Sequence, residues 1–106
     1  MTTPAATVHV DLPGRAYDIQ IGPDLLSGAG AAITPFGGRK HLAIVTDETV
    51  AGLHLAELQA GLTEAGFTSA ALSLPAGEAT KSWPQLQRTV EWLLDQKVER
   101  GDVVIA

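Results

Sequence analysis

Two side chains of opposite charge stand three residues apart in the stretch LPAGEATKSW, residues 74–83. The carboxylate of Glu78 can accept hydrogen bonds from a sugar diol, and the ammonium group of Lys81 can donate to sugar or phosphate oxygens. A solvent-exposed ion pair is the alternative interpretation, and such a pair contributes at most about 1 kcal/mol to stability. Residue types and spacing therefore leave both a ligand-binding role and a simple turn open.

The position of this stretch makes the charged pair a candidate ligand site. An apolar run, residues 67–74, predicts a buried strand before it, and Ser82 with Pro84 indicates a helix start behind it. Ser82 and Gln85 also have the spacing of a capping box, in which each side chain bonds to a free backbone N–H. The helix start thus needs neither charged residue, and parallel sheets bind ligands beyond the carboxyl ends of their strands.

A second expected strand end also carries an acid. Thr46 and Asp47 lie between the apolar run 41–46 and a helical segment. An Asp at this place caps a helix by accepting a hydrogen bond from a free backbone N–H, and the spacing favours that role. In nucleotide-binding folds an acid after a strand also accepts hydrogen bonds from ribose hydroxyls. Both roles stay open for Asp47.

The remaining residues with chemical potential form no recognisable site. His9, His41 and His54 fall on different expected elements without the short spacing of metal ligands, so we predict no metal site and no catalytic residue in this chain. The sequence has no cysteine, which excludes thiolate sites and disulfides. Neither a dinucleotide G-x-G-x-x-G fingerprint nor a P-loop follows a strand. Trp83 and Trp92 are predicted to be packing residues.

The periodicity of apolar residues predicts the elements that position these side chains. Two alternating runs joined by Pro13, Gly14 and Arg15 predict a β-hairpin with a solvated polar face. Behind it, continuous apolar runs alternate with amphipathic segments, as in a parallel sheet with right-handed crossovers. The predicted fold class is α/β, a Rossmann-like parallel sheet with an N-terminal β-hairpin. The expected elements are strands 7–12 and 16–21, a short helix around Leu25 and Leu26, strand 41–46, helix 47–66, strand 67–74, helix 84–96 and strand 103–106.

The two long helices carry apolar stripes that are expected to face the core. Gly66 stands where a glycine normally ends a helix. The stripes consist of Val50, Ala51, Leu53, Leu55, Leu58 and Leu62 in the first helix, and of Leu86, Val90, Leu93 and Leu94 in the second.

Composition limits the size of the protein and its partners. The 106 residues are 45% hydrophobic and 18% charged, which is typical of one small globular domain. The formal net charge of −5 argues against nucleic acid and against an anionic membrane surface. The N-terminus does not resemble a signal peptide, and no apolar stretch approaches the ~20 residues of a membrane span, so a cytoplasmic protein is expected. The sequence ends within an expected strand, VVIA, which predicts an N-terminal part of a longer protein.

These motifs together resemble the N-terminal domain of the 3-dehydroquinate synthase family. The resemblance rests on the hairpin ending in YDIQIG, on IVTDETV at the first strand end, and above all on LPAGEATKS, which matches a Pro-x-Gly-Glu-x-x-Lys-Ser motif of that family. It covers residues 7–106. It implies a lyase that converts 3-deoxy-D-arabino-heptulosonate 7-phosphate into 3-dehydroquinate and phosphate in the shikimate pathway, with NAD and a divalent metal, zinc or cobalt, as cofactors.

The resemblance also assigns roles to residues of this chain. It implies that Asp47 and Thr49 lie near the adenosine part of NAD, and that Gly77, Glu78 and Lys81 contact NAD. Metal ligands and substrate-binding residues of the family have no counterpart here, so residues 1–106 are expected to form the N-terminal part of the NAD-binding domain and to be inactive alone. A homodimer is implied for the full-length enzyme.

Two alternatives stay open at this stage. One is a relative with the same N-terminal architecture, either a sugar-phosphate cyclase or a metal-dependent polyol dehydrogenase, which would differ in the C-terminal half. The other is a non-catalytic, flavodoxin-like binding module, which would fold cooperatively as a monodisperse 106-residue chain.

Overall fold

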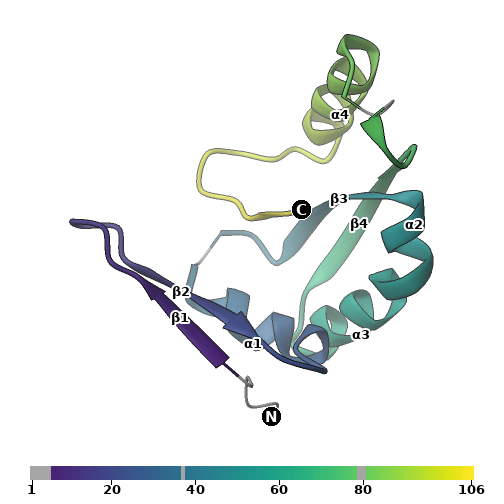
Figure 1. Ribbon diagram of the computed structural model, residues 1–106. Helices are drawn as coiled ribbons and strands as arrows, with labels where there is room; N and C mark the ends of the chain where they lie inside the picture. The colour runs from purple at the N-terminus through teal and green to yellow at the C-terminus, as the bar shows by residue number, and fades with distance from the viewer. Residues whose placement is uncertain (1–5, 37, 79–80) are drawn as a thin grey trace.

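The computed structural model describes residues 6–36, 38–78 and 81–106 (Figure 1). Two residues of the LPAGEATKSW stretch, 79 and 80, lie outside the described residues. In chain order the elements are β1 (Ala6–Val10), β2 (Tyr17–Ile21), η1 (Leu26–Gly28), α1 (Ala29–Ile33), η2 (Thr34–Phe36), β3 (His41–Asp47), α2 (Glu48–Val50), the π-helical turn η3 (Ala51–Leu55), α3 (Ala56–Glu64), β4 (Thr68–Leu74), α4 (Trp83–Asp95) and β5 (Val104–Ile105).

A three-stranded parallel sheet forms the centre of the molecule, in the order β4-β3-β5. The crossover from β3 to β4 runs through the helical segment 48–64, and the crossover from β4 to β5 runs through α4. Figure 1 shows these two helical segments on opposite sides of β3 and β4. The predicted α/β class and the alternation of strands and helices are therefore confirmed.

The core lies between β3 and the helical segment 48–64. Leu42, Ile44, Leu62 and Phe67 are buried together there, and partly buried Leu55 and Leu58 pack against them. Gly66 has a φ of +90°, and the N–H of Phe67 donates to the carbonyl oxygen of Leu62 at 2.9 Å. This is the predicted glycine cap, and its geometry is the one expected where a helix ends on a left-handed residue.

The first helix differs from the prediction at its start. Val50 and Leu53 were expected on the buried stripe, yet 46% and 69% of their surface is exposed. The reason is the π-helical turn η3, which winds more residues into one turn than an α-helix does and so changes the direction in which Leu53 points. Uninterrupted apolar periodicity cannot reveal such a turn.

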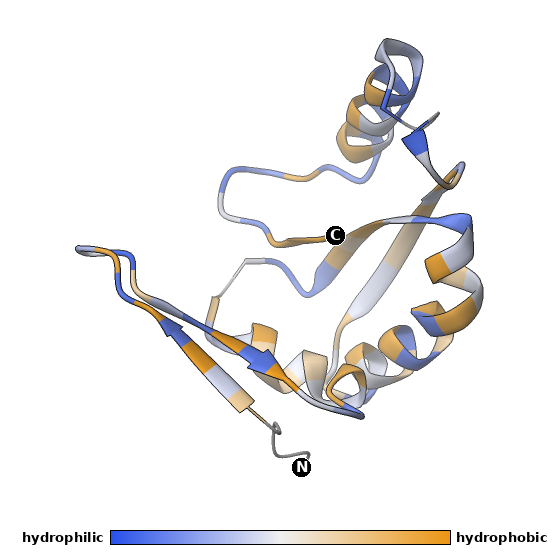
Figure 2. Ribbon diagram, viewed as in Figure 1, coloured by the Kyte–Doolittle hydropathy of each residue, from blue (hydrophilic) through white to orange (hydrophobic). Residues whose placement is uncertain are grey.

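The second helix, α4, forms within one residue of its predicted bounds, but its apolar stripe is not buried. Leu86, Val90 and Leu94 are 51%, 46% and 68% exposed, so the prediction that they form core is wrong. None of the thirteen residues of α4, all of which the structure describes, is fully buried. The hydropathy colouring shows the apolar stripe on this helix plainly (Figure 2). The helix contacts β4, yet its apolar stripe stays largely exposed.

The hairpin of β1 and β2 is antiparallel as predicted, with Val8 opposite Ile19 and His9 opposite Asp18. The linking turn places Gly14 at φ +70°. Its polar face carries a hydrogen bond of 2.6 Å between His9 Nδ1 and Asp18 Oδ1. Its apolar face is exposed too, at 47% for Val8 and 44% for Ile19. Among the described residues the hairpin pairs with no other strand.

Small residues in segment 22–36 allow close packing against α3. The predicted short helix around Leu25 and Leu26 is present but longer, because η1, α1 and η2 follow one another from Leu26 to Phe36. A Cβ atom on Gly61 would lie 2.7 Å from the carbonyl oxygen of Ser27, and one on Gly30 would overlap Ala65. The two backbones therefore approach each other at a distance that only glycine permits.

Candidate functional site

The two candidate strand ends lie next to each other at the carboxyl edge of the sheet. β3 ends at Asp47 and β4 ends at Leu74, and these two residues are paired neighbours in the parallel register. The LPAGEATKSW stretch therefore begins beside Asp47, although 27 residues separate them in sequence. This is the edge at which open α/β sheets bind their ligands.

Asp47 caps the helix that follows β3. Its Oδ1 accepts a hydrogen bond of 2.7 Å from the backbone N–H of Val50, and its own backbone is extended at φ −101° and ψ 167°. The capping role that the spacing favoured is therefore confirmed. One carboxylate oxygen carries this bond, so the cap leaves the other oxygen available. Thr49 lies within α2 and is exposed on the same edge.

The turn after β4 brings the charged pair together. The backbone N–H of Lys81 donates to the carbonyl oxygen of Glu78 at 3.0 Å, and Lys81 Nζ lies 3.3 Å from Glu78 Oε1. The two side chains are 73% and 88% exposed. Gly77 has a φ of +86°, and among the described residues nothing lies within 4 Å of a Cβ built on it. The glycine is thus required by backbone conformation and not by crowding within this chain.

The predicted capping box between Ser82 and Gln85 is wrong. Ser82 occupies the N-cap position with extended backbone, but its side chain makes no capping hydrogen bond. Pro84 explains this in part, because it removes one of the N–H groups that a serine cap normally bonds. The Oε1 atom of Gln85 is buried and has no hydrogen-bond partner among the described residues. Two polar side chains that the sequence assigned to the helix start are therefore not used there.

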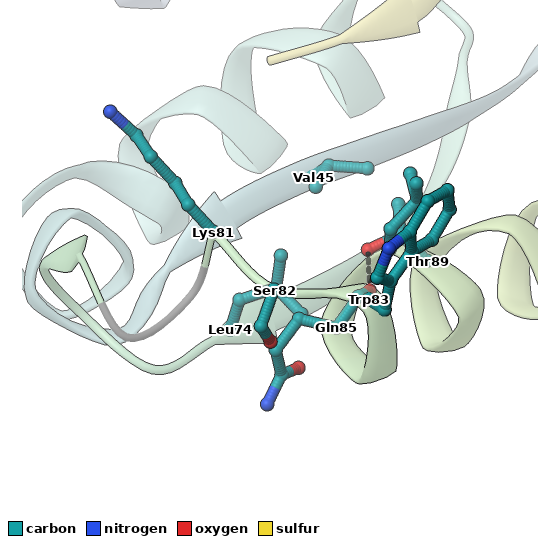
Figure 3. A pocket seen from close by; sticks show the side chains of 8 residues that line it. Val45, Leu74, Lys81, Ser82, Trp83, Gln85 and Thr89 are labelled. Carbon is teal, nitrogen blue, oxygen red and sulfur yellow. Dashed lines mark hydrogen bonds between the residues drawn. The ribbon is translucent and has the colours of Figure 1, made fainter.

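A pocket of about 560 Å³ opens between α4 and the carboxyl ends of β3 and β4. Figure 3 shows the Lys81 side chain extending away from the other labelled residues, and Val45 lies between Lys81 and Trp83 in that view. Its lining consists of Val45, Leu74, Trp83 and Leu86 on the apolar side, and of Lys81, Ser82, Gln85 and Thr89 on the polar side.

Trp83 is a member of this pocket that the sequence analysis missed. It was predicted to be a packing residue, but 81% of its surface is exposed, so that prediction is wrong for Trp83, whereas Trp92 is half-buried. Trp83 directly follows the charged turn in the sequence, and this position was the signal from which its place in the pocket could have been predicted. A large apolar side chain at the first position of a helix at a strand's carboxyl end can face a ligand as well as a core.

The opposite, amino edge of the sheet holds a network of polar contacts. Asp102 Oδ2 accepts from Arg39 Nε at 2.9 Å and from the backbone N–H of Glu99 at 2.9 Å, and Oδ1 accepts from the backbone N–H of Arg39 at 3.2 Å. Arg39 Nη2 also donates to the carbonyl oxygen of Gln96. His41 joins the network through Gln96 Oε1 at 2.9 Å and Thr68 Oγ1 at 2.8 Å. We call Arg39, His41, Thr68, Gln96 and Asp102 the amino-edge network.

This network lowers the pKa of Asp102. The N–H of Glu99 has the largest effect, burial acts in the opposite direction, and the N–H, side chain and charge of Arg39 lower the pKa further. The Asp102 side chain is only 7% exposed, so its carboxylate is held by these donors instead of by water. The network is therefore structural: it joins the segments that lead into β3 and β5 to the end of α4.

Neither a metal cluster nor a membrane segment is found in the described part of the chain. Within residues 6–36, 38–78 and 81–106, no three His, Asp or Glu side chains are placed to hold a metal ion. No helix among these residues is long and apolar enough to cross a membrane.

Comparison with known proteins gives strong matches to one enzyme. The chain is 66% identical over 100 residues to a 3-dehydroquinate synthase of Roseobacter denitrificans, 59% to one of Ruegeria pomeroyi and 57% to one of Jannaschia sp.. Each match covers 94% of this chain and 27% of the relative. The chain thus spans about a quarter of the length of the curated relatives that it matches. No protein-family model matches it.

Proposed function

This chain is related in sequence to the N-terminal region of 3-dehydroquinate synthases, and from that relationship we propose that the protein carrying it has the same activity. The reaction would convert 3-deoxy-D-arabino-heptulosonate 7-phosphate into 3-dehydroquinate and phosphate. The observation that carries the proposal is the identity of 57–66% across 94% of the chain, which includes the charged turn at the carboxyl edge. None of the relatives reported above is named as a different cyclase, a polyol dehydrogenase or a non-catalytic module.

We propose that residues 1–106 contribute part of the NAD-binding domain. When bound, NAD would accept a hydride from the substrate and later return it. The groups at the carboxyl edge suit such a ligand. Glu78 offers an exposed carboxylate to ribose hydroxyls, and Lys81 offers an ammonium group to ribose or phosphate oxygens. The apolar wall of the neighbouring pocket, formed by Val45, Leu74, Trp83 and Leu86, offers a surface for a flat base.

The roles of Asp47, Thr49 and Gly77 follow the same proposal. Asp47 uses Oδ1 to cap α2, which fixes the carboxylate in place and leaves Oδ2 for a ribose hydroxyl. Thr49 lies two residues further along the same exposed turn. Gly77 leaves open space above its backbone among the described residues, so a ligand can approach the turn closely.

The remaining parts of the proposal concern the whole protein. A divalent metal, zinc or cobalt, would be bound outside this chain, because the described residues offer no cluster that fits one. The sugar-phosphate substrate would also be bound mainly by residues outside this chain. A homodimer in the cytoplasm completes the proposal, and the 106-residue chain alone is expected to show no turnover.

A chimera tests the activity most directly. We would replace the matching N-terminal region of the Roseobacter denitrificans 3-dehydroquinate synthase with this chain and measure phosphate release. The expected result is NAD-dependent turnover, because the sequence identity of 66% should preserve the interface with the rest of the enzyme. A chimera that folds but releases no phosphate would count against the proposal.

The NAD site is tested by one substitution and its matched control. In the chimera, Glu78→Ala should weaken NAD binding by about 10–100-fold, the loss expected for charge-assisted hydrogen bonds. Glu64→Ala removes an exposed acid at the end of α3, on the far edge of the sheet, and should leave the affinity unchanged. Calorimetric titration with NAD provides the readout. Equal affinities for Glu78→Ala and the unmodified chimera would remove Glu78 from the site.

A further inference from the structure

The C-terminal end of α4 is fixed to the sheet by hydrogen bonds. The carbonyl oxygen of Gln96 accepts a hydrogen bond of 2.8 Å from Arg39 Nη2, and Gln96 Oε1 lies 2.9 Å from His41 Nε2. Both partners belong to the amino-edge network, and His41 is the first residue of β3. Trp92 and Leu93, in the last turns of the helix, are half-buried. This end of α4 is therefore held in place at the start of β3.

The N-terminal half of α4 has no comparable attachment. The pocket of about 560 Å³ lies between this half and the carboxyl ends of β3 and β4. Val45 and Leu74 line it from the sheet, and Trp83 and Leu86 line it from the helix (Figure 3). Among the described residues, no hydrogen bond joins residues 83–90 to a strand. One half of the helix thus borders an open, largely apolar space, whereas the other end is bonded to the sheet.

We propose that α4 pivots about its C-terminal end, so that its N-terminal half closes onto the carboxyl ends of β3 and β4. Closure brings Leu86 toward Val45 and Leu74, expels water from the pocket and buries apolar surface, which favours the movement. The amino-edge network stays intact and acts as the hinge. Segments with few buried contacts are the ones that move in folded proteins, and the N-terminal half of α4 is such a segment.

The charged turn moves together with the helix. The N–H of Leu86 donates to the carbonyl oxygen of Ser82 at 3.0 Å, and the N–H of Lys81 donates to that of Glu78 at 3.0 Å. Asp47, in contrast, is fixed at the end of β3 by its bond to the helix that follows. Closure therefore changes the position of Glu78 and Lys81 relative to Asp47. The movement needs no ligand, so its failure would leave the proposed function unaffected.

The test is nuclear magnetic resonance relaxation dispersion on the isotope-labelled 106-residue chain without nucleotide, since this method detects exchange on the μs–ms timescale of hinge motions. Signals of Val45, Leu74 and Leu86 should show exchange at one common rate, because the two walls of the pocket change their surroundings together. Signals of Trp92 and Leu93 should show no exchange at that rate. Absence of exchange at the pocket, or equal exchange along all of α4, would overturn the proposal.

Fraying of the first helical turn is the motion that the test must distinguish from a pivot. Saturation-transfer experiments give the chemical shifts of the minor state at residues 83–90. A pivoting helix keeps helical Cα shifts in that state, whereas a frayed turn shows the shifts of an unfolded chain. Unfolded shifts, or exchange confined to the helix without Val45 and Leu74, would overturn the proposal.

Two leucine variants test the closing contact. Leu86→Ala removes the side chain that closes onto the sheet, so the population of the closed state should fall about tenfold and the exchange at Val45 should be lost. Leu94→Ala is the matched control, because Leu94 belongs to the same exposed stripe but does not line the pocket. It should leave the exchange at Val45 unchanged. Equal effects of the two variants would contradict closure at Leu86.

Two glutamine variants test the hinge. Gln96→Ala removes the contact with His41, so exchange should extend to Trp92 and Leu93. Gln87→Ala removes only an exposed hydrogen bond of 3.0 Å to Glu91 and should leave the exchange pattern as in the wild type. The spectrum of each variant shows whether it is folded. An unchanged pattern in folded Gln96→Ala would overturn the assignment of the hinge to the amino-edge network.

Discussion

The two edges of the parallel sheet use their polar side chains in opposite ways. At the amino edge, Asp102 accepts three hydrogen bonds and is 7% exposed, and Arg39 reaches both Asp102 and the end of α4. At the carboxyl edge, the side chains of Glu78 and Lys81 contact each other at 3.3 Å and are 88% and 73% exposed. One edge is closed by contacts within the chain, whereas the charged side chains of the other are largely exposed to solvent.

If the carboxyl edge binds NAD as proposed, the difference separates residues that stabilise the fold from residues that bind a ligand. Strands of a parallel sheet share their amino ends on one edge and their carboxyl ends on the other, so the two tasks can be assigned to different edges. Side chains that hydrogen-bond to one another at the amino edge hold the strands, and this lets the charged groups of the carboxyl edge stay exposed to solvent. Substitutions at the amino edge should therefore change stability, and substitutions at the carboxyl edge should change binding.

The largest effect on stability is expected from Gly38→Ala at the amino edge. Gly38 has a φ of +80°, and a Cβ atom there would lie 2.9 Å from the carbonyl oxygen of Gly101 and 3.2 Å from Cα of Asp102. An alanine at this φ strains the backbone, and its Cβ also displaces the segment before β5, so both effects destabilise the folded state. We expect the free energy of unfolding to fall by about 2–5 kcal/mol, measured by urea denaturation.

Gly77→Ala is the matched control at the carboxyl edge. Gly77 has nearly the same backbone conformation, with φ +86°, but no described atom lies within 4 Å of the added Cβ. Only the backbone cost should remain, which is about 1–2 kcal/mol. The difference between the two alanine variants measures how tightly the amino edge is closed. Equal losses would contradict the contrast between the edges.

Acid should weaken the amino edge through Asp102. Because the donors around it lower its pKa from the ordinary value of 3.8, its carboxylate stabilises the fold above that value. This stabilisation is lost as the pH falls below 3.8 and through the lowered pKa of the folded state. Asp102→Asn lacks the titrating group, so the gap in unfolding free energy between wild type and variant should shrink over that range. A gap that stays constant from pH 7 to pH 2 would show that Asp102 does not stabilise the fold in this way.

Local patterns in the sequence predicted the elements and both strand ends. Apolar runs and helical stripes placed β3, β4, α4 and the glycine cap at Gly66 within one or two residues, because these features depend on neighbours along the chain. The cap at Asp47 could be predicted for the same reason, since its partner is only three residues away. The edge proposed to bind a ligand followed from strand direction alone.

Features that depend on distant segments could not be predicted. Arg39 and Asp102 are 63 positions apart, and no periodicity links them. The exposure of Trp83 and of the α4 stripe depends on how the helix approaches the sheet, which its own sequence does not encode. The capping box at Ser82 failed for a different reason: its spacing was present, but the hydroxyl makes no such bond in the structure.

Asp47→Ala should have a moderate effect on stability. Asp47 lies at the carboxyl edge and is proposed to bind NAD, but it also stabilises the fold by capping α2. The loss of the hydrogen bond from the N–H of Val50 should lower the unfolding free energy by about 1 kcal/mol. Asp47→Asn keeps an oxygen that can cap the helix but loses the charge, so its stability should stay close to that of the wild type. If Asp47 also binds a ribose hydroxyl, Asp47→Asn should weaken NAD binding in the chimera while the helix stays capped. Equal stability of Asp47→Ala and wild type would show that the cap does not matter.

The smallest effect on stability is expected from Lys81→Ala. Both members of the charged pair are largely exposed, and the entropy of holding two long side chains offsets most of their attraction in water. The unfolding free energy should therefore stay within about 0.5 kcal/mol of the wild-type value in urea denaturation. Titration of the same variant in the chimera should nevertheless show weaker NAD binding. A clear loss of stability with unchanged NAD affinity would reverse the contrast between the two edges, because the charged turn would then hold the fold together and bind nothing.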